Sequence, residues 1–437
     1  MNIQTIAAHT LGCKVNQYDT QAMLELFQQE GYRIVSIEQP ADVYLVNTCT
    51  VTGTGDRKSL QLIRKIRREH PFSSLIVCGC MAQQRADELL SLGADLVLGT
   101  QRRIEVVTLL NQVQKTGKPL CAVKPLDHQM TFENLCVSTQ TNHTRAVLKI
   151  QEGCNNHCSY CIIPDVRGPV RSRPLDEIEK EVRRLSLGGF SEIVLTGIHL
   201  CSYGQDLLPS HSLLDVIKAV QNTDGILRIR LGSLEPTVAT REFASELRKN
   251  DKVCPQFHLA LQSGSNSVLA RMKRRYNTSQ YQQGVDNLLS EFPHAAITTD
   301  ILTGFPGETI AEYDETASMI ERIGFARIHV FPYSPRPGTP AASFPGQLPK
   351  AEKERRAREL ISLGNKISES YMNSWIGLET SVLPEKKVSG CWEGYTPEYI
   401  RVRLDNSDQC RPGVPEKVHL LKALPRMMCG KKISNTK

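Results

Sequence analysis

The segment GCNNHCSYC (residues 153–161) carries three cysteines, Cys154, Cys158 and Cys161, in a CxxxCxxC spacing. It directly follows the apolar run 146–150, which predicts a short buried strand that ends in a loop. Within a loop, three thiolates can converge on one point. Structural zinc sites normally have four protein ligands, and ferredoxin-type clusters are held by four cysteines. Three cysteines without an obvious fourth ligand therefore indicate a metal centre that keeps one position open.

The composition is that of an ordinary globular protein. Its 437 residues, 40% hydrophobic and 23% charged, are enough for two or three domains. The sequence does not begin with a secretory signal, and no stretch approaches ~18 uninterrupted apolar residues, so we expect a cytoplasmic protein without a membrane segment. Fourteen cysteines in such a chain favour metal binding over disulfides. The net charge of +7 is compatible with a polyanionic partner.

Residues 1–115 alternate between strand-like and helix-like runs, which predicts a small α/β domain with a parallel sheet. Cysteines follow three of the predicted strands: Cys13, Cys49, and either Cys78 or Cys80. The carboxyl ends of parallel strands meet at one edge of a sheet, so these cysteines can form a second metal site rather than lie scattered in the core. Cys80 lies three residues beyond the last apolar residue of its strand, as Cys49 does. Cys80 is therefore the predicted third ligand, and Cys78 a buried strand residue.

The middle of the chain predicts a barrel. Residues 116–142 are polar and irregular and are predicted as a linker. Across 143–374 a strand–helix unit recurs six times, which predicts a (βα)6 partial barrel related to the TIM barrel. Chemistry in such barrels gathers at the carboxyl ends of the strands. The predicted strands span residues 146–150, 192–197, 227–233, 257–263, 296–304 and 327–334.

Four polar residues and one glycine near these strand ends are candidates for binding a cofactor. A glycine lets backbone approach a ligand closely, and polar side chains can hydrogen-bond to it. A satisfied turn or helix cap explains each polar residue equally well. The candidates are Thr196, Gly197, Ser233, Glu235 and Gln262.

Positive charge is concentrated in three parts of the chain. The predicted helix 56–69 carries six basic residues, and the segment RMKRRYN (271–277) places four beside a tyrosine. Each segment is either a solvated surface or a contact for a nucleic acid backbone. Residues 375–437 alternate between short strand-like runs and turns, which predicts a small antiparallel β-barrel. Its 11 Lys+Arg against 7 Asp+Glu favour RNA binding as a hypothesis.

Taken together, these motifs resemble the radical S-adenosylmethionine (SAM) methylthiotransferases over nearly the whole chain, including a C-terminal TRAM-like RNA-binding domain. The aromatic Tyr160 before the third cysteine of the CxxxCxxC loop belongs to the resemblance. Within the family, LGCKVNQ and CTVTGTGDRKS are most similar to the MtaB type, the tRNA N6-threonylcarbamoyladenosine methylthiotransferase. The other motifs are GCMAQ, RGPVRSRP, EIVLTGIHL, LGSLEP, LQSGS and GFPGET.

The resemblance implies two [4Fe–4S] clusters and SAM, which serves as radical source and methyl donor. One cluster would be held by Cys154, Cys158 and Cys161, and the auxiliary cluster by Cys13, Cys49 and Cys80. SAM would contact Tyr160 and the five candidates at the strand ends. The target, the C2–H bond of an adenine, is neither acidic nor electrophilic, so cofactor radical chemistry is implied and no side chain is expected to be catalytic.

The implied product is 2-methylthio-N6-threonylcarbamoyladenosine at position 37 of tRNA, next to the anticodon. The implied partners are tRNA and an electron donor such as flavodoxin or ferredoxin, while the sulfur donor is not identified. One alternative is a related methylthiotransferase that acts on isopentenyladenosine in tRNA or on an aspartate of a ribosomal protein. Another is a metal-stabilised RNA-binding protein without catalysis, although two sets of three cysteines fit tetrahedral zinc poorly.

Overall fold

The N-terminal domain is built on a parallel sheet, as shown by a computed structural model that describes residues 3–127, 130–138, 144–405 and 410–433. The six strands lie in the order β2-β1-β3-β4-β5-β6. The order reverses between β1 and β3, the kind of place where ligands bind in open α/β sheets. The strands are β1 (Thr5–Thr10), β2 (Arg33–Val35), β3 (Val43–Thr48), β4 (Ser74–Gly79), β5 (Leu96–Val97) and β6 (Leu120–Cys121).

Helices cover both faces of this sheet. One face packs against α1 (Lys14–Gln29) and α5 (Val106–Thr116), with Phe27 among the buried residues between them. The other face packs against α2 (Gly53–Glu69), whose Ile63 and Ile66 are buried there. The short helices α3 (Cys80–Gln84) and α4 (Ala86–Ser91) lie on that second face, and η1 (Arg103–Glu105) precedes α5. The predicted small α/β domain with a parallel sheet is confirmed.

The six predicted strands of the central domain are all present as parallel strands. They correspond to β7 (Arg145–Glu152), β9 (Glu192–Gly197), β10 (Arg228–Leu231), β12 (Gln256–Leu259), β13 (Ala296–Thr303) and β14 (Arg327–Pro332). The sheet divides after β10 into two four-stranded parts, which are completed by β8 (Arg171–Ser172) and β11 (Ser233–Leu234). One continuous core fills the space between strands and helices. The open (βα)6 barrel is therefore confirmed.

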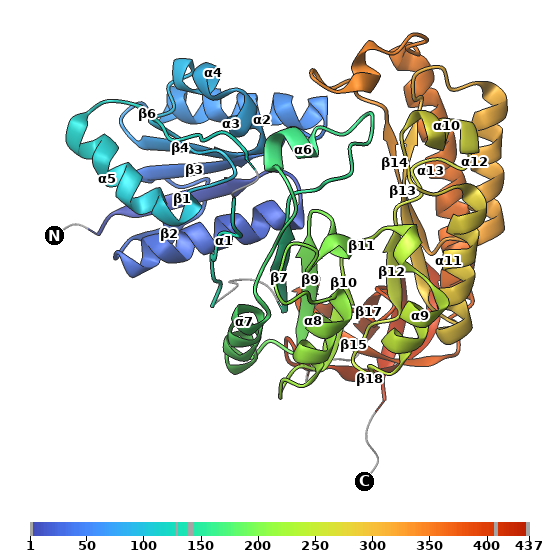
Figure 1. The fold of residues 1–437 in the computed structure, drawn as a ribbon. Coiled ribbons are helices and arrows are strands. Elements are labelled where there is room, and N and C mark those ends of the chain that lie inside the picture. The colour runs from blue at the N-terminus through green and yellow to red at the C-terminus, as the bar shows by residue number, and fades with distance from the viewer. Residues whose placement is uncertain (1–2, 128–129, 139–143, 406–409, 434–437) are drawn as a thin grey trace.

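Helices connect the barrel strands in sequence. Figure 1 shows the later helices, within residues 241–323, on the side away from the N-terminal domain, whereas the first, residues 163–167, lies between the two domains. The helices are α6 (Ile163–Arg167), α7 (Leu175–Leu187), α8 (Leu213–Gln221), α9 (Arg241–Arg248), α10 (Asn266–Arg271), α11 (Thr278–Glu291) and α12 (Ile310–Ile323).

The segment predicted as a linker packs closely against the N-terminal domain where it is described. It adds β6 to the edge of the sheet, pairing with β5, and buries Leu135 and Val137 against Tyr18. Residues 128–129 and 139–142 of this segment lie outside the described residues. The sequence did not indicate these contacts, because the segment is polar and few apolar residues take part in them.

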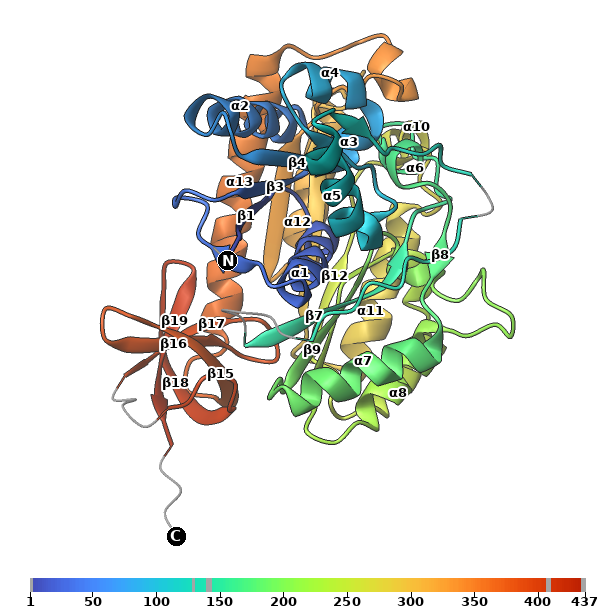
Figure 2. The same cartoon turned by 90° about the vertical axis from the view of Figure 1, so that its left-hand side faces the viewer.

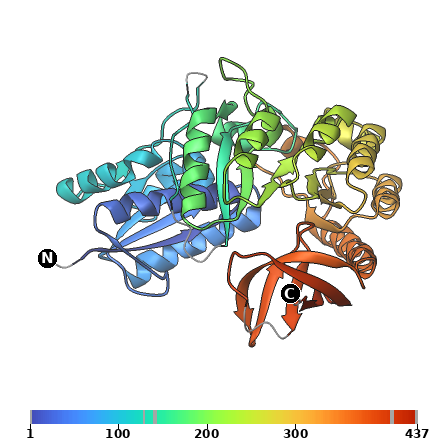
Figure 3. The same ribbon diagram turned by 90° about the horizontal axis from the view of Figure 1, so that it is seen from below.

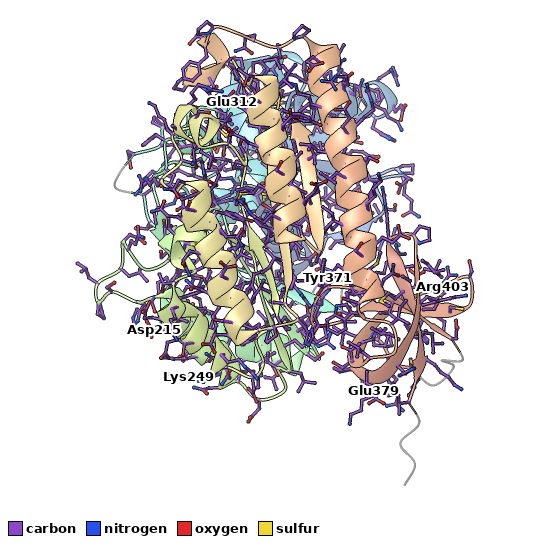
Figure 4. The ribbon with its side chains drawn as sticks, turned by 90° about the vertical axis from the view of Figure 1, so that its right-hand side faces the viewer. Asp215, Lys249, Glu312, Tyr371, Glu379 and Arg403 are labelled. Carbon is purple, nitrogen blue, oxygen red and sulfur yellow. The ribbon has the colours of Figure 1, made fainter. Side chains whose placement is uncertain are left out.

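The C-terminal domain is a closed five-stranded barrel, as predicted. Four of its five strand pairs are antiparallel as expected, but residues 401–405 and 427–432 pair in parallel. Helix α13 (Lys350–Asn373) leads into it and runs beside α12; Figure 4 shows Tyr371 near the junction and Arg403 on the barrel. The barrel contacts the first strands of the central domain, since Arg228 Nη1 donates to Tyr395 O at 3.0 Å. Figure 3 shows it below the other two domains. Its strands are β15 (Glu379–Val388), β16 (Cys391–Tyr395), β17 (Arg401–Asp405), β18 (Glu416–Leu424) and β19 (Met427–Lys432).

A search of the described residues finds no helix with the length and apolarity needed to span a membrane.

Candidate metal and cofactor site

Three cysteines follow three neighbouring strands of the N-terminal sheet. Cys13 comes after β1 and caps α1, Cys49 comes directly after β3, and Cys80 comes after β4 and begins α3. These strands are adjacent and in register, with Thr48 opposite Gly79. We call Cys13, Cys49 and Cys80 the sheet trio. The structure brings its members to one edge of the sheet.

Backbone geometry allows the members of the sheet trio to approach one another. Gly12 has a φ of +106°, and a methyl group there would lie 2.8 Å from Cys49 Cβ, so a glycine is required. Burial raises the pKa of the Cys49 thiol to about 12, and the nearby thiols of Cys80 and Cys13 contribute to the shift. Cys13 is exposed and Cys80 is buried, so the trio runs from the surface into the interior.

The neighbouring Cys78 lies apart from the sheet trio. It is fully buried within β4, in the core between the sheet and helices α1 and α5. Cys80 packs instead with Ile162 and Val166 of the central domain. The side chain of Cys80 thus lies toward the central domain, whereas that of Cys78 lies in the core of the N-terminal domain. This arrangement supports the choice of Cys80 as the third ligand.

The other three cysteines lie in the loop between β7 and α6. Cys154, Cys158 and Cys161 form what we call the barrel trio. Burial raises the pKa of Cys161 to about 12, with contributions from the thiols of Cys158 and Cys154, and burial also raises the pKa of Cys154. The backbone NH of Asn156 donates to Cys154 Sγ at 3.3 Å. The three thiols of this loop therefore lie close enough to influence one another.

The donor set fits iron–sulfur clusters better than single metal ions. Thiols with raised pKa values stay protonated at neutral pH unless a metal displaces the proton. Structural zinc sites normally take four protein ligands, whereas each trio offers three thiols. Among the described residues, no group of three or more His, Cys, Asp or Glu side chains is arranged to hold a single metal ion. In a cluster, each cysteine binds a different iron, so its ligands are spread more widely. Each trio suits a cluster that keeps one iron free of protein.

Arginine side chains donate hydrogen bonds to both trios. Arg167 Nε lies 3.3 Å from Cys80 Sγ, and Arg274 Nη1 lies 3.3 Å from Cys158 Sγ. Such charged donors stabilise thiolate sulfur and tune the reduction potential of a cluster. Arg274 belongs to RMKRRYN, for which a nucleic acid contact was one expectation. It points inward, and Arg271 pairs with Glu312 at 2.8 Å, so these two side chains are not a surface for nucleic acid.

Helix α6 joins the two trios. It begins two residues after Cys161, and its Val166 packs against Cys80. The backbone NH of Cys154 donates to Gly168 O at 3.1 Å, just beyond the end of the helix. Figure 1 shows α6 between the N-terminal and central domains. One short element therefore fixes the position of each trio relative to the other.

A buried ionic network surrounds this junction. Arg167 is completely buried, donates to Glu152 Oε1 at 2.7 Å, and hydrogen-bonds to Asn16 of α1. Burial disfavours an ionised Glu152, but the nearby cations, Arg167 foremost, hold its pKa well below its usual range. The other charged members are Asp19, Arg103, Glu133 and Lys149. Sequence reasoning missed this network; the signal was Lys149, a charge within the strand predicted to be buried at 146–150, with Glu152 just beyond it.

A polar cluster lies beside the barrel trio at the carboxyl ends of the strands. Glu235 Oε2 lies 3.0 Å from His199 Nε2 and 3.3 Å from Asn156 Nδ2. Burial alone would raise the pKa of Glu235, but the hydrogen bond from His199 and the charges of His199 and Arg274 lower it below its usual value. An ionised carboxylate therefore lies next to the cysteines.

The remaining candidates for cofactor contact occupy different surroundings. Tyr160 packs against the apolar cluster of Phe305 and Tyr333, while Thr196 is buried and Ser233 is exposed. Gln262 has a φ of +65°, an uncommon conformation for a non-glycine residue that redirects its side chain at the end of β12. These residues come from several strand ends, as the partial barrel requires.

Gly197 lies in close contact with a neighbouring strand. A methyl group at this position would lie 2.8 Å from Gln151 Oε1, so the close neighbour is a side chain of the protein itself. Gln151 in turn accepts a hydrogen bond from the backbone NH of His199 at 2.7 Å. Gly197 thus makes room for the residue that positions His199.

Models of two known families match the chain. The model described as uncharacterized protein family UPF0004 matches residues 5–99, and that of the radical SAM superfamily matches residues 148–320. The first match contains the sheet trio and the second contains the barrel trio.

Curated relatives match nearly the full length. Threonylcarbamoyladenosine tRNA methylthiotransferase MtaB of Bacillus subtilis (strain 168) is 40% identical, over 96% of this chain and 94% of the relative. MtaB of Thermotoga maritima is 36% identical, over 91% of each chain. The tRNA-2-methylthio-N(6)-dimethylallyladenosine synthase of Pelotomaculum thermopropionicum is 35% identical, over 86% of this chain and 85% of the relative.

Among solved structures, the chain is similar to the radical S-adenosylmethionine methyltransferase TsrM from Kitasatospora setae, determined with cobalamin and a [4Fe–4S] cluster bound. The TM-score is 0.60 at 14% sequence identity, over 78% of this chain and 74% of that chain. At this identity the likeness concerns the fold alone.

Proposed function

Because the chain belongs to the radical SAM tRNA methylthiotransferase family, we propose that it converts N6-threonylcarbamoyladenosine of tRNA to its 2-methylthio derivative, at position 37 beside the anticodon. Among the relatives, the MtaB enzymes reach 40% identity and the dimethylallyladenosine enzyme 35%. All of these relatives act on tRNA, so a ribosomal-protein substrate is not favoured. A metal-stabilised binding protein is not favoured either, since the radical SAM model matches the region of the barrel trio.

The observation that carries the proposal is the pair of cysteine trios joined by α6. We assign the SAM-binding [4Fe–4S] cluster to the barrel trio and the auxiliary [4Fe–4S] cluster to the sheet trio. When bound, the clusters would relay an electron from the external donor and hold the sulfur to be inserted, and SAM would supply the radical and the methyl group, none of which a side chain can provide. The protein's own residues hold, orient and shield them.

Individual side chains have defined tasks in this proposal. Glu235 is an acceptor that the Asn156 and His199 contacts hold in place, suited to the ammonium or ribose hydroxyls of SAM. Arg274 and Arg167 stabilise the thiolates of Cys158 and Cys80. Tyr160, Thr196, Gly197, Ser233 and Gln262 complete the proposed SAM contacts from the surrounding strand ends.

The remaining assignments follow from the substrate. We place the enzyme in the cytoplasm, with flavodoxin or ferredoxin as electron donor, because tRNA and reduced carriers are found there. The C-terminal barrel is the proposed RNA-binding domain, since its 11 basic residues exceed its 7 acidic ones. Deletion of residues 375–437 should weaken tRNA binding in a filter assay, and an unchanged affinity would count against this role.

Mass spectrometry of tRNA nucleosides from a strain lacking the gene tests the proposed reaction. The 2-methylthio-N6-threonylcarbamoyladenosine peak should disappear, with N6-threonylcarbamoyladenosine accumulating in its place. A plasmid carrying the wild-type gene should restore the peak, and one carrying Cys49→Ala should not. Loss of 2-methylthio-isopentenyladenosine instead would assign the enzyme to the related substrate.

A further inference from the structure

Helix α2 presents a row of basic side chains to solvent. Its apolar face, with Ile63 and Ile66, packs on the sheet, so residues 57, 58, 61, 64, 65 and 68 lie on the opposite side. At ~1.5 Å per residue, this row is about 16 Å long, enough to follow several phosphates of one nucleic acid strand. The five basic members of the row, all exposed, are Arg57, Lys58, Arg64, Lys65 and Arg68.

Few acidic groups neutralise this row. The helix has two acidic residues, and one of them, Asp56, is mostly buried and bound to Arg336 at 2.8 Å. The other, Glu69, lies 3.9 Å from Lys65 and 3.2 Å from Arg68. The side chains of Lys65 and Arg68 remain 63% and 74% exposed, so these pairs are weak and easily exchanged for a phosphate.

A fully exposed aromatic ring lies just beyond the end of the row. Phe72 is 101% exposed, although the residues on either side of it are held in place. Arg67 Nη1 donates to Pro71 O and to Ser73 O, each at 3.0 Å, and Arg67 Nη2 donates to Asp95 at 2.6 Å. The one arginine of the helix that turns away from the row thus fixes the loop that presents Phe72. A held, exposed ring beside cations is suited to stacking on a base.

The row begins close to the sheet trio. Helix α2 starts four residues after Cys49, and the backbone NH of Gly53 donates to Ser334 Oγ of the central domain at 3.2 Å. A cavity of about 510 Å³, lined in part by Thr50 and Arg336, opens at this end. Figure 2 shows α2 and the C-terminal barrel on the same side of the molecule, at opposite ends. A polyanion that binds both α2 and the C-terminal barrel would therefore extend along the N-terminal domain.

We propose that the α2 surface, the five cations of the row together with Phe72, binds the phosphate backbone of tRNA, with the Phe72 ring stacked on an unpaired base. The assignment rests on the proposed function, which supplies tRNA as the polyanion. The α2 surface is then a second tRNA contact, in addition to the one proposed for the C-terminal barrel. Together they hold the substrate at two separated points.

Binding of full-length tRNA, measured by fluorescence anisotropy at several KCl concentrations, tests the surface. The variant Arg64→Gln/Lys65→Gln/Arg68→Gln should bind about 10-fold or more weakly and lower the slope of log K against log[salt] by about 2 to 3. Phe72→Ala should bind about 5-fold more weakly without a change in slope. The matched control is Lys180→Gln/Arg183→Gln/Arg184→Gln on the exposed face of α7, which should bind like the wild type.

Each other outcome has a defined meaning. An α2 variant whose affinity and salt slope equal those of the α7 control would overturn the proposal. So would loss of binding to phosphatidylserine vesicles with tRNA affinity unchanged, which would assign the surface to a membrane. If the α2 variant loses tRNA affinity but the wild type forms no methylthio product, the surface stands and the proposed reaction fails. Unchanged iron content and thermal midpoint would show that the variants are folded.

Discussion

The sheet trio and the barrel trio provide the same three thiols in opposite ways. The barrel trio occupies eight consecutive residues, so its geometry is set by one loop. The sheet trio is assembled from three strand ends that are up to 67 residues apart, from Cys13 to Cys80. It exists only because β1, β3 and β4 are neighbours in the sheet. A cluster site can therefore be encoded locally or by the topology of a whole domain.

This difference has a consequence for stability. The barrel trio depends on a short loop and on Arg274, whereas the sheet trio depends on the register of three strands and on the docking of α6. Changes in the core of the N-terminal domain should disturb the sheet trio and leave the barrel trio intact.

The largest expected effects follow from removing one ligand of each trio. After anaerobic reconstitution, Cys49→Ala and Cys158→Ala should each retain about half of the wild-type iron, because each trio is proposed to hold its own cluster. Both should lose formation of the methylthio product. Cys158→Ala should also lose reductive cleavage of SAM, which Cys49→Ala should retain. Full iron in Cys49→Ala would contradict the assignment of the sheet trio.

The cysteine positions could be predicted from the sequence because they depend on local pattern. Cys80 was preferred over Cys78 from its offset beyond the apolar strand, and the structure places Cys80 toward the central domain. The partial barrel was predicted for the same reason, since each strand carries its own apolar run. The offset of a cysteine from its strand and the apolar run of each strand are local, whereas the meeting of Cys13, Cys49 and Cys80 also required the prediction of a parallel sheet.

The charged network and the inward arginine could not be predicted in this way. Arg167 meets Asn16 and Cys80, which lie 151 and 87 residues away, and no local pattern encodes such a pairing. Arg274 sits in a basic segment whose composition is typical of a surface, yet it turns toward Cys158. The position of Arg167 depends on the docking of two domains, and that of Arg274 on the packing of distant segments within the central domain.

The next largest effect is expected at Arg167. Arg167→Met should lower the free energy of unfolding by about 3–5 kcal/mol, because it leaves Glu152 and Asp19 buried with fewer cations. It should also separate α6 from α1 and reduce the iron retained by the sheet trio more than that of the barrel trio. Urea unfolding of the cluster-free chain and iron counting measure the two effects. Arg183→Gln, on an exposed helical face, is the control and should stay within about 0.5 kcal/mol.

A smaller effect is expected at Cys78, which lies two residues before Cys80 in the sequence but is buried in the core of the N-terminal domain. Cys78→Ala should lower the free energy of unfolding by about 1 kcal/mol, because a small buried group is lost. Iron content should equal that of the wild type, whereas Cys80→Ala should lose about half. Iron loss in Cys78→Ala with full iron in Cys80→Ala would reverse the assignment of the third ligand.

A local effect of similar size is expected where the loop after Cys49 is held against the central domain. Arg336 Nη1 donates to Thr50 O at 3.0 Å and to Asp56 Oδ2 at 2.8 Å, and both charged side chains are mostly buried. Arg336→Gln should lower the free energy of unfolding by about 1–2 kcal/mol, because its hydrogen bonds to Thr50 and Asp56 are lost. The loss is no larger because Asp56 keeps a second cation, Arg85, at 3.9 Å.

Hydrogen exchange and chelation separate this local effect from a general one. In Arg336→Gln, amides of residues 50–56 should exchange faster, while those of the loop that holds the barrel trio should not change. A chelator should remove iron faster from the sheet trio alone, since its second ligand lies at the end of the loosened loop. Equal acceleration at both trios would mean that Arg336 stabilises the whole domain interface, and the sheet trio would then not depend on this loop in particular.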